Sequence, residues 1–437
     1  MFNSLCFDIH KHKIFIKNKN LSLTYGEVFK LSTSWAKYFR DHALDDTIAL
    51  SMPNCLEAHI LLFAAMQSHN VTLINPTLLQ LSPDLLDRLN VTTLVSFAVL
   101  DVAVNQITLD RSDIVRLCVA EEPSDMLHSL TLLSSGTTGE VKPVVLQATE
   151  IEQYGSLLNK YFLLDANDCL YNVLPYYHGF GLTRMFTAMN SGSAYYIPDE
   201  PDYRNIVSDI NKYRCTWISL VPNMAKVMIK NSGALPENFK FATVSADICS
   251  QQLIESFKQR FGVELFSEYG CTEASVISSN TQAHNKAGSV GKIDAATVKI
   301  INNEIYATTQ WKNQSDWVNT GDIGSIDADG FLFIHGRTKE IIKRQGKTIF
   351  PHELEKNLEA VTGVDEAVVY YDGTDNKGDC IGLAYVGTAE IEEVKSYCLT
   401  DLPADYRPKT ITRLKTIPRV GPKVRRREMR EYVNKFQ

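Results

Sequence analysis

Hydrophobic and polar positions follow two periods along the chain, and these predict helices and strands in turn. After Thr24, apolar residues recur at helical spacing to about Arg40, and Thr24 and Glu27 have the spacing of a capping box. Short apolar runs follow, with a longer helical run at 56–66. We therefore predict early strands at 47–52, 71–74 and 92–99. Strands that alternate with helices are typical of parallel sheets covered by helices.

The middle of the chain continues this alternation and then changes character. Further strands are predicted from Tyr171 onward and at 194–197, 216–221, 241–245 and 263–266. Three short apolar runs then follow at 298–301, 304–308 and 331–334. Asn302-Asn303 and Asp327-Ala328-Asp329-Gly330 separate these runs, and both are hairpin turn signals. We predict a small antiparallel unit there.

The chain becomes more charged beyond Arg337, which indicates a second domain. The pattern predicts a connector at 339–346, a helix that opens at Pro351, strands at 367–371 and 381–386, and a helix at about 390–400. The predicted fold class is α/β. A large N-terminal domain (1–337) carries α/β sheets and the small antiparallel β unit, and a smaller α+β C-terminal domain (338–437) follows.

Composition and charge exclude several classes of function. The chain has 437 residues and a formal net charge of -7, so it lacks the basic excess of a nucleic-acid binder. Its nine cysteines are dispersed without a C-x-x-C pair, as expected of free thiols in a reducing compartment. We see no leader-peptide pattern and no apolar run long enough to span a bilayer. We expect a cytoplasmic protein without a membrane span.

A loop rich in small residues follows the predicted strand that ends at Leu133. It consists of Ser134, Ser135, Gly136, Thr137, Thr138 and Gly139, with Lys142 three positions later. Glycines let a backbone approach a ligand closely, and hydroxyl groups donate hydrogen bonds, so such a loop can wrap a polyphosphate. The Walker A spacing is absent, and a bland polar connection is the alternative.

Three further motifs follow this loop in order. They are Tyr269-Gly270-Cys271-Thr272-Glu273, Thr320-Gly321-Asp322 and Gly336-Arg337. Together with the loop they resemble the AMP-forming carboxylate-activating superfamily, which includes acyl- and aryl-CoA synthetases, peptide-synthetase adenylation domains and beetle luciferases. The resemblance covers nearly the whole chain, and four motifs in order are far more specific than any one.

The resemblance implies an enzyme that uses ATP and Mg²⁺ to convert a carboxylic acid into an acyl-adenylate, with release of pyrophosphate. The acyl group would then pass to the thiol of CoA or to the phosphopantetheine of an acyl or peptidyl carrier protein. Two alternatives stay open: an adenylate diverted to a non-thiol acceptor, and an inert ligand-sensing member. Val141, Pro422 and the stretch from Ser245 to Cys249, which lacks the glycines usual in the family, motivate the second alternative. Pro143 also departs from the family pattern.

The resemblance also assigns the nucleotide contacts. The loop from Ser134 to Gly139, with Lys142, would hold the β- and γ-phosphates. Tyr269 would stack on adenine, Thr272 would contact the α-phosphate and Glu273 would bind the Mg²⁺ ion. Gly270 would belong to the same nucleotide site. Asp322 would accept both ribose hydroxyls, which suits a carboxylate, and Arg337 would contact the ribose.

The acid site and the C-terminal domain are assigned in the same way. His178 resembles the histidine beside the acid's carboxylate, and Lys423 the catalytic lysine near the C-terminus. Without the resemblance, His178 fits a structural histidine and Lys423 a solvated basic run. Lys339 matches the hinge about which the family's mobile C-terminal domain rotates, and Gly346 matches the pantetheine tunnel.

The substrate class follows from what surrounds His178. Family members that take α-amino acids carry an aspartate for the ammonium group, and we find none between Tyr171 and Thr183. An aryl or fatty acid is therefore favoured over an α-amino acid. The candidate pocket residues are Tyr177, Phe180, Trp217 and Ala246.

Overall fold

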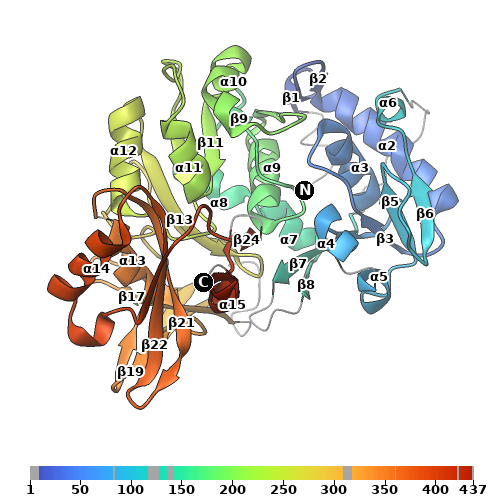
Figure 1. Ribbon diagram of the computed structural model, residues 1–437. Helices are drawn as coiled ribbons and strands as arrows, with labels where there is room; N and C mark the ends of the chain where they lie inside the picture. The colour runs from blue at the N-terminus through green and yellow to red at the C-terminus, as the bar shows by residue number, and fades with distance from the viewer. Residues whose placement is uncertain are drawn as a thin grey trace.

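The computed structural model describes residues 9–81, 84–116, 127–135, 141–308, 317–359, 361–420 and 423–435. Two large, mostly parallel sheets and a small antiparallel sheet form the N-terminal part, and a separate sheet forms the C-terminal part. Figure 1 shows the first sheet on the right and the C-terminal part at the lower left. The predicted α/β class, with a small antiparallel unit and a smaller α+β C-terminal domain, is confirmed. The boundary between residues 337 and 338 stays a prediction.

The first sheet has six strands, in the order β6 (Asn105–Thr108), β5 (Thr93–Ser96), β3 (Thr47–Leu50), β4 (Asn70–Leu73), β7 (Leu130–Ser135) and β8 (Val141–Leu146). Five of these strands are parallel, and β8 pairs antiparallel with β7 at the edge. The predicted strands at 47–52, 71–74 and 92–99 are confirmed, with shorter bounds. The small-residue loop therefore joins the two strands of an edge hairpin.

The second sheet has eight strands, in the order β14 (Ser275–Ser279), β13 (Leu265–Cys271), β12 (Phe241–Val244), β11 (Trp217–Leu220), β9 (Cys169–Tyr171), β10 (Ala194–Tyr196), β1 (Ile14–Lys17) and β2 (Ser22–Thr24). Its central strands are parallel, and β2 and β14 are antiparallel at the two edges. Strand β13 extends through Tyr269 to Cys271, beyond the predicted end at Phe266. The polar motif that starts at Ser267 thus belongs to a strand and its hairpin.

Helices cover both sheets. They are α2 (Tyr25–His42), α3 (Leu56–Met66), α4 (Pro76–Leu81), α5 (Leu85–Arg88), α6 (Arg111–Ile114), α7 (Ala148–Gln153), α8 (Ser156–Phe162), α9 (Gly179–Ser191), α10 (Ile206–Tyr213), α11 (Pro222–Ile229) and α12 (Gln251–Phe261), with a 3₁₀ turn at Tyr203–Asn205. The capping box at Thr24 and Glu27 is present, because each side chain accepts a hydrogen bond from the other residue's backbone. Among the helices that the structure describes, none is long and apolar enough to cross a membrane.

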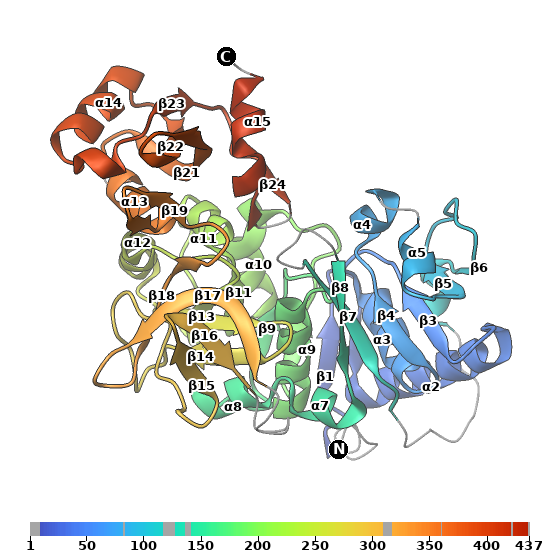
Figure 2. The same ribbon diagram turned by 90° about the horizontal axis from the view of Figure 1, so that it is seen from below.

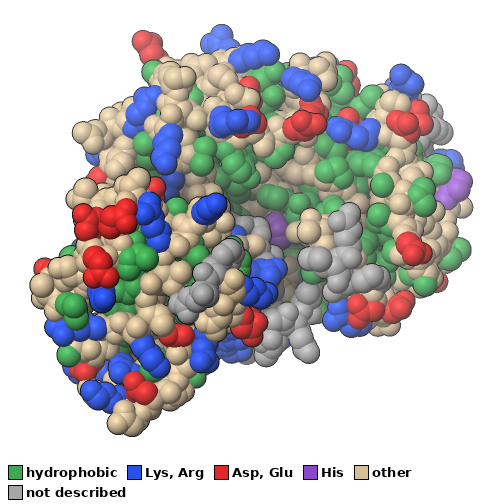
Figure 3. All heavy atoms as spheres, in the orientation of Figure 1, with side chains coloured by type: hydrophobic (Ala, Val, Ile, Leu, Met, Phe, Trp, Pro, Cys, Tyr) green, Lys and Arg blue, Asp and Glu red, His purple; other side chains and the backbone are tan. Residues whose placement is uncertain are grey.

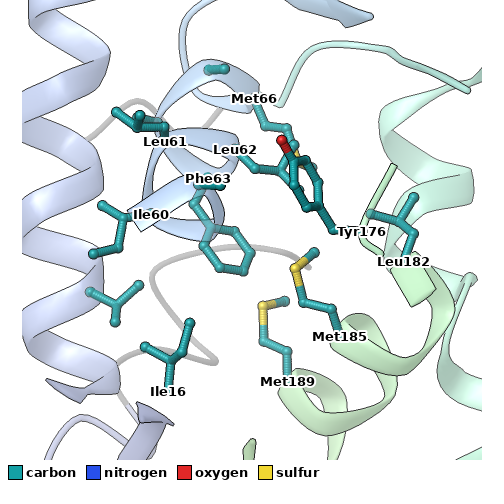
Figure 4. Close-up of a cluster of buried hydrophobic side chains, with 14 of the residues drawn as sticks. Ile16, Ile60, Leu61, Leu62, Phe63, Met66, Tyr176, Leu182, Met185 and Met189 are labelled. Carbon is teal, nitrogen blue, oxygen red and sulfur yellow. The ribbon is translucent and has the colours of Figure 1, made fainter. Parts of the chain in front are cut away.

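Helix α3 lies at the centre of the largest hydrophobic core. Ten of its eleven residues are buried, which is why its sequence is apolar on every side. Figure 4 shows Phe63 of α3 pointing toward Met185 and Met189 of α9, with Tyr176 beside Met66. This packing holds α9, which carries Phe180 and directly follows His178, against the rest of the N-terminal part.

The small antiparallel sheet contains β15 (Val298–Ile301), β16 (Glu304–Ala307), β17 (Val318–Ile326) and β18 (Leu332–Arg337). Asn302 and Asn303 have φ angles of 52° and 66°, as a tight hairpin turn requires, so the predicted hairpin is confirmed. Strand β17 is an addition to the prediction. Its glycines and polar residues interrupt the apolar pattern of a strand.

The C-terminal domain has its own sheet and core. Its elements are β19 (Ile342–Arg344), β20 (Lys347–Ile349), α13 (Pro351–Glu359), β21 (Val364–Asp375), β22 (Gly378–Gly387), α14 (Ile391–Thr400), β23 (Thr410–Arg413), β24 (Arg419–Val420), β25 (Lys423–Val424) and α15 (Met429–Asn434), with 3₁₀ turns at Ala404–Tyr406 and Arg426–Glu428. The prediction of a connector at 339–346 was wrong. Strands β19 and β20 form a hairpin there, and Gln345 and Gly346 have φ angles of 51° and 75° at its turn.

A polar seam joins the C-terminal domain to the second sheet. Figure 2 shows α13 and β19 close to α11 and α12. Lys226 Nζ of α11 lies 3.7 Å from Glu359 Oε1 of α13 and donates a hydrogen bond of 3.5 Å to the backbone oxygen of Asp365. A pocket along this seam is lined by residues of both parts, including Asp247 and Arg426.

Candidate active site

The candidate site lies where the parallel strands of the second sheet end. Strands β11, β12 and β13 run side by side, and their carboxyl ends lead to the segments that carry Ala246 and Thr272. Ligands of open parallel sheets commonly bind at this edge. Figure 3 shows a hollow between this body and the C-terminal domain, with hydrophobic side chains along its upper wall.

Three predicted nucleotide contacts meet at one corner of this edge. The Tyr269 hydroxyl donates a hydrogen bond of 2.7 Å to Asp322 Oδ2, and Arg337 Nε lies 3.2 Å from Asp322 Oδ1. Tyr269 comes from β13, whereas Asp322 and Arg337 face each other across the β17–β18 pair. The corner therefore joins the second sheet to the antiparallel sheet. It presents an aromatic ring beside a carboxylate, a combination that suits a nucleoside.

The electrostatics of this corner keep its groups in fixed protonation states. Burial, reinforced by the Asp322 carboxylate, raises the pKa of Tyr269 well above its ordinary value. Tyr269 therefore keeps its proton and remains a hydrogen-bond donor. Burial works against the charge of Arg337, but Asp322 and Glu340 outweigh it and raise the pKa of Arg337. Asp322 thus lies next to a permanent cation.

Thr272 and Glu273 lie at the tip of the β13–β14 hairpin, next to the first residue of α9. A Cβ atom on Gly179 would lie 3.3 Å from Thr272 Oγ1 and 2.9 Å from the Tyr154 hydroxyl. The Tyr154 hydroxyl in turn donates a hydrogen bond of 3.3 Å to the Thr272 backbone oxygen. Gly270 is required for the tight turn, because a Cβ there would lie 2.3 Å from the Ser275 oxygen. The predicted Tyr269-to-Glu273 motif is thus a rigid hairpin end.

His178 stands at the start of α9 and faces solvent. It is the N-cap residue, with its ring 5.0 Å from the ring of Tyr177, and α9 begins at Gly179. The amide groups at the start of a helix carry partial positive charge and attract anions. Because Gly179 contacts Thr272, this positive end lies beside the hairpin tip. Phosphate and carboxylate oxygens would be stabilised there.

The structure separates the four candidate pocket residues. Tyr177 and Phe180 are partly exposed at the start of α9, and Ala246 is exposed at the end of β12. Trp217 is buried in the core with its ring stacked 5.6 Å from the ring of Phe241. Ala246 has a φ angle of 72°, a left-handed conformation that normally favours glycine. Ala246 therefore adopts a backbone conformation that a glycine would adopt more readily.

Part of the predicted phosphate and catalytic machinery lies outside the described residues. This holds for Gly136, Thr137, Thr138, Gly139 and the side chains of Ser135 and Lys423. Ser134 and Lys142 face each other in the β7–β8 pair, and Ser134 Oγ donates a hydrogen bond of 3.4 Å to the Lys142 backbone oxygen. The backbone of Lys423 belongs to β25, which pairs with β24. Lys339 is exposed in the turn after β18.

Comparison with known proteins identifies the family. The family model described as AMP-binding enzyme matches residues 85–307, just over half of the chain. The chain belongs to the AMP-binding enzyme family. An oxalate–CoA ligase from Arabidopsis thaliana is 27% identical over 340 residues, which are 68% of this chain and 66% of the relative. A 2-succinylbenzoate–CoA ligase from Listeria monocytogenes is 28% identical over 69% of each chain.

Solved structures share the fold of this AMP-binding enzyme along nearly its whole length. MatB from Rhodopseudomonas palustris with bound ATP has a TM-score of 0.86 and 18% identity, and 99% of each chain is covered. The o-succinylbenzoate CoA synthetase MenE from Bacillus subtilis in complex with AMP has a TM-score of 0.84, 22% identity and 97% coverage of each chain. At such identities the likeness establishes the two-domain fold. In sequence, the matches span 53% to 69% of the length of the first curated relatives.

Two arginines of this AMP-binding enzyme were missed by sequence reasoning. Arg184 of α9 is fully buried and pairs with Glu268 of β13, and Arg426 is buried and contacts Glu340 and Glu355. Arg426 had been grouped with a solvated basic run. It anchors the strand that carries Lys423, three residues earlier, to α13 and to the junction after Arg337.

Proposed function

We propose that the chain activates a carboxylic acid with ATP and then transfers the acyl group to the thiol of coenzyme A. The observation that carries this proposal is the corner formed by Tyr269, Asp322 and Arg337, next to the hairpin tip and the start of α9. Family membership supports the adenylation step. The curated relatives named as CoA ligases support coenzyme A as the acceptor, and a carrier-protein thiol is the alternative.

In the proposed first step, an acid oxygen attacks the α-phosphorus of ATP and the bond to the leaving pyrophosphate breaks. Asp322 accepts hydrogen bonds from the ribose, and Tyr269 packs against adenine. Thr272 and the first amides of α9 donate to the α-phosphate and to the acid, where negative charge gathers in the transition state. Lys142 and Lys423 add positive charge to the phosphates. In the second step the thiol attacks the acyl carbon, and AMP leaves.

Magnesium fits this site as a companion of the nucleotide. Glu273 supplies one partly exposed carboxylate at the hairpin tip. Within the described ranges there is no group of three or more metal-ligating side chains. Mg²⁺ often binds through one or two carboxylates together with phosphate oxygens and water, so one glutamate is sufficient. Bound there, the ion would neutralise phosphate charge.

The test is ATP–pyrophosphate exchange with a panel of acids, followed by mass spectrometry for the CoA thioester. Oxalate, sulfoacetate and 2-succinylbenzoate, for which three relatives are named, belong in the panel. We expect exchange with at least one acid. We expect Asp322→Asn to raise the KM for ATP by about tenfold or more, because a charged acceptor contributes about 1.5–3 kcal/mol. Asp329→Asn, an exposed position in the turn between β17 and β18, is the matched control.

Two results would count against the proposal. Absence of exchange with every acid would exclude adenylation. An unchanged KM for ATP in Asp322→Asn would remove the assigned role of the corner, because loss of the carboxylate must weaken a ribose bound there. If exchange occurs but no CoA thioester forms, the result would favour a carrier-protein thiol as the acceptor.

A further inference from the structure

A fully buried ion pair lies directly behind the candidate acid site. Arg184 of α9 and Glu268 of β13 are both buried, and Arg184 Nη2 lies 2.5 Å from Glu268 Oε1. Arg184 Nε donates a hydrogen bond of 2.6 Å to Ser219 Oγ, which lies 2.7 Å from Thr243 Oγ1. Four polar side chains from one helix and three strands therefore meet inside the protein. Charged residues are rarely found fully buried without a reason.

This network is incomplete. Among the described residues, Arg184 Nη1 and Glu268 Oε2 have no hydrogen-bond partner, although both atoms are shielded from solvent. We call them the two orphan atoms. An unsatisfied buried polar atom costs about 1–3 kcal/mol, and more when it is charged. In native proteins such exceptions call for an explanation, such as a functional role or a bound water or ion.

The sheet sets the depth at which these atoms lie. Strands β11, β12 and β13 each carry a buried aromatic residue and, two positions later on the same face, a polar one. The aromatic layer is Trp217, Phe241 and Phe266, and the polar layer is Ser219, Thr243 and Glu268. Glu268 immediately precedes Tyr269, and the hairpin tip follows. The polar layer thus lies between the aromatic core and the candidate site.

The helix brings Arg184 toward the same place. Arg184 lies six residues after His178, a rise of about 9 Å along α9, and long side chains on helices point back toward the N-terminus. Its guanidinium lies 4.5 Å from the ring centre of Phe180, which is partly exposed. Phe180 therefore covers the guanidinium on the side of the site.

We propose that the two orphan atoms bind a hydroxyl group at the far end of the acid, so that the substrate is a short hydroxy acid, aryl or alkyl. This rests on the proposed function. A hydroxyl oxygen accepts a hydrogen bond from Arg184 Nη1, and its hydrogen is donated to Glu268 Oε2, so one group satisfies both atoms. Arg184 and Glu268 together carry no net charge. A second carboxylate on the acid would be repelled by Glu268, and an alkyl end would leave both atoms unsatisfied.

The ionisation of the pair agrees with this geometry. Burial raises the pKa of Glu268 and lowers the pKa of Arg184, and each residue opposes the shift of the other. Both charges are thus under a desolvation penalty that a hydrogen-bonding ligand relieves.

Matched acids test the proposal in the unmodified enzyme. We would measure kcat/KM for ATP–pyrophosphate exchange with benzoic and para-hydroxybenzoic acid, cinnamic and para-hydroxycinnamic acid, and hexanoic and omega-hydroxyhexanoic acid. Terephthalic acid supplies the second carboxylate. We expect the hydroxy member of the preferred pair to exceed its unsubstituted partner by at least about tenfold, the effect of about 1.5 kcal/mol for a hydrogen bond to a charged group. Terephthalic acid should be the poorer substrate.

A double variant separates recognition from folding. Arg184→Met/Glu268→Leu replaces the pair with apolar side chains, and such replacements commonly preserve stability. Its preference for the hydroxy acid should fall to within about twofold of unity, with an unchanged KM for ATP. Arg111→Met, which breaks a partly exposed ion pair with Glu57 far from the site, should keep the full preference.

The outcomes distinguish this inference from the proposed function. Equal kcat/KM for a hydroxy acid and its unsubstituted partner would overturn the inference, and so would a higher kcat/KM for terephthalic acid. Neither result would count against the proposed adenylation. Persistence of the hydroxyl preference in the double variant would also overturn it. Absence of exchange with any acid would overturn both.

Discussion

Two buried arginine–glutamate pairs use the same residue types in different ways. Arg426 in the C-terminal domain engages its whole guanidinium: Nε lies 3.0 Å from Glu340 Oε2, Nη1 donates to Glu355 Oε1 and to the Val369 oxygen, and Nη2 lies 3.2 Å from Glu355 Oε2. Arg184 makes one contact with Glu268, and the two orphan atoms remain. Burial alone therefore does not reveal a binding site. The two pairs differ in whether the protein itself completes their hydrogen bonds.

The largest expected effect comes from breaking the complete pair. Arg426→Met leaves Glu355 buried without its cation, and we expect unfolding free energy to fall by about 3–5 kcal/mol. Urea unfolding, monitored by tryptophan fluorescence and circular dichroism, measures this change. Replacing both residues, as Arg426→Met/Glu355→Leu, should restore most of it. A loss below about 1 kcal/mol in the single variant would show that the pair is not an anchor.

The two glutamates should respond to pH with opposite signs. Burial opposes ionisation of Glu355, but Arg426 and His352 outweigh it and lower its pKa from 4.5 to about 2. Its contribution is present above pH 4.5 and is lost as pH falls toward 2, about 3 kcal/mol in all. The pKa of Glu268 is raised, so its contribution is present at low pH and is lost as pH rises through the folded value.

Urea unfolding between pH 3 and pH 7 checks these signs, with Glu355→Gln and Glu268→Gln each compared with the unmodified chain. The destabilisation caused by Glu355→Gln should shrink as pH falls. The unfolding free energy of Glu268→Gln, relative to that of the unmodified chain, should increase as pH rises. Parallel curves for the two variants would contradict the comparison.

Removing the incomplete pair should have a smaller effect on stability. Because the two orphan atoms lose their desolvation cost, Arg184→Met/Glu268→Leu should unfold within about 1 kcal/mol of the unmodified chain or gain up to about 2 kcal/mol. The same unfolding assay at pH 7 measures it. A decrease in the free energy of unfolding of more than about 3 kcal/mol would show that Arg184, like Arg426, mainly stabilises the fold.

The smallest expected effect concerns the strained edge of the site. Ala246 adopts a left-handed conformation that costs about 1–2 kcal/mol for a residue with a Cβ. Ala246→Gly relieves this strain, but glycine loses about 0.5–1 kcal/mol of chain entropy. We expect a net gain of about 0.5 kcal/mol, visible as a small rise in Tm. Lower stability in the variant would show that the methyl group makes compensating contacts.

Local patterns predicted much of the fold. The capping box at Thr24, the apolar helix at 56–66 and the Asn302-Asn303 turn all depend on neighbouring residues, and all three were confirmed. Strand β17 escaped prediction because glycines and polar residues interrupt its apolar pattern, and its pairing with β16 and β18 decides its state. The hairpin at β19–β20 was missed for a similar reason.

The candidate site residues that belong to short sequence motifs could be predicted from the sequence. Tyr269, Asp322 and Arg337 were named together from short motifs, and they meet in the structure. The Arg184–Glu268 pair joins residues 84 positions apart, so no local pattern reveals it. One signal was present: three successive strands contain an aromatic residue followed two positions later by a polar one. Polar residues are uncommon in fully buried strands, so one in each of three neighbouring strands indicates a shared polar layer.

The seam at Lys226 has a consequence for how firmly the two parts are held together. Its contacts, at 3.5 and 3.7 Å, involve a side chain that is one third exposed. Exposed ion pairs contribute less than about 1 kcal/mol and weaken further when salt screens them. The buried contacts of Arg426 with Glu340, Glu355 and Val369, by contrast, join residues of the C-terminal part to one another. We therefore expect higher ionic strength to weaken the Lys226 seam and to leave the buried contacts of Arg426, which lies three residues after Lys423, largely unchanged.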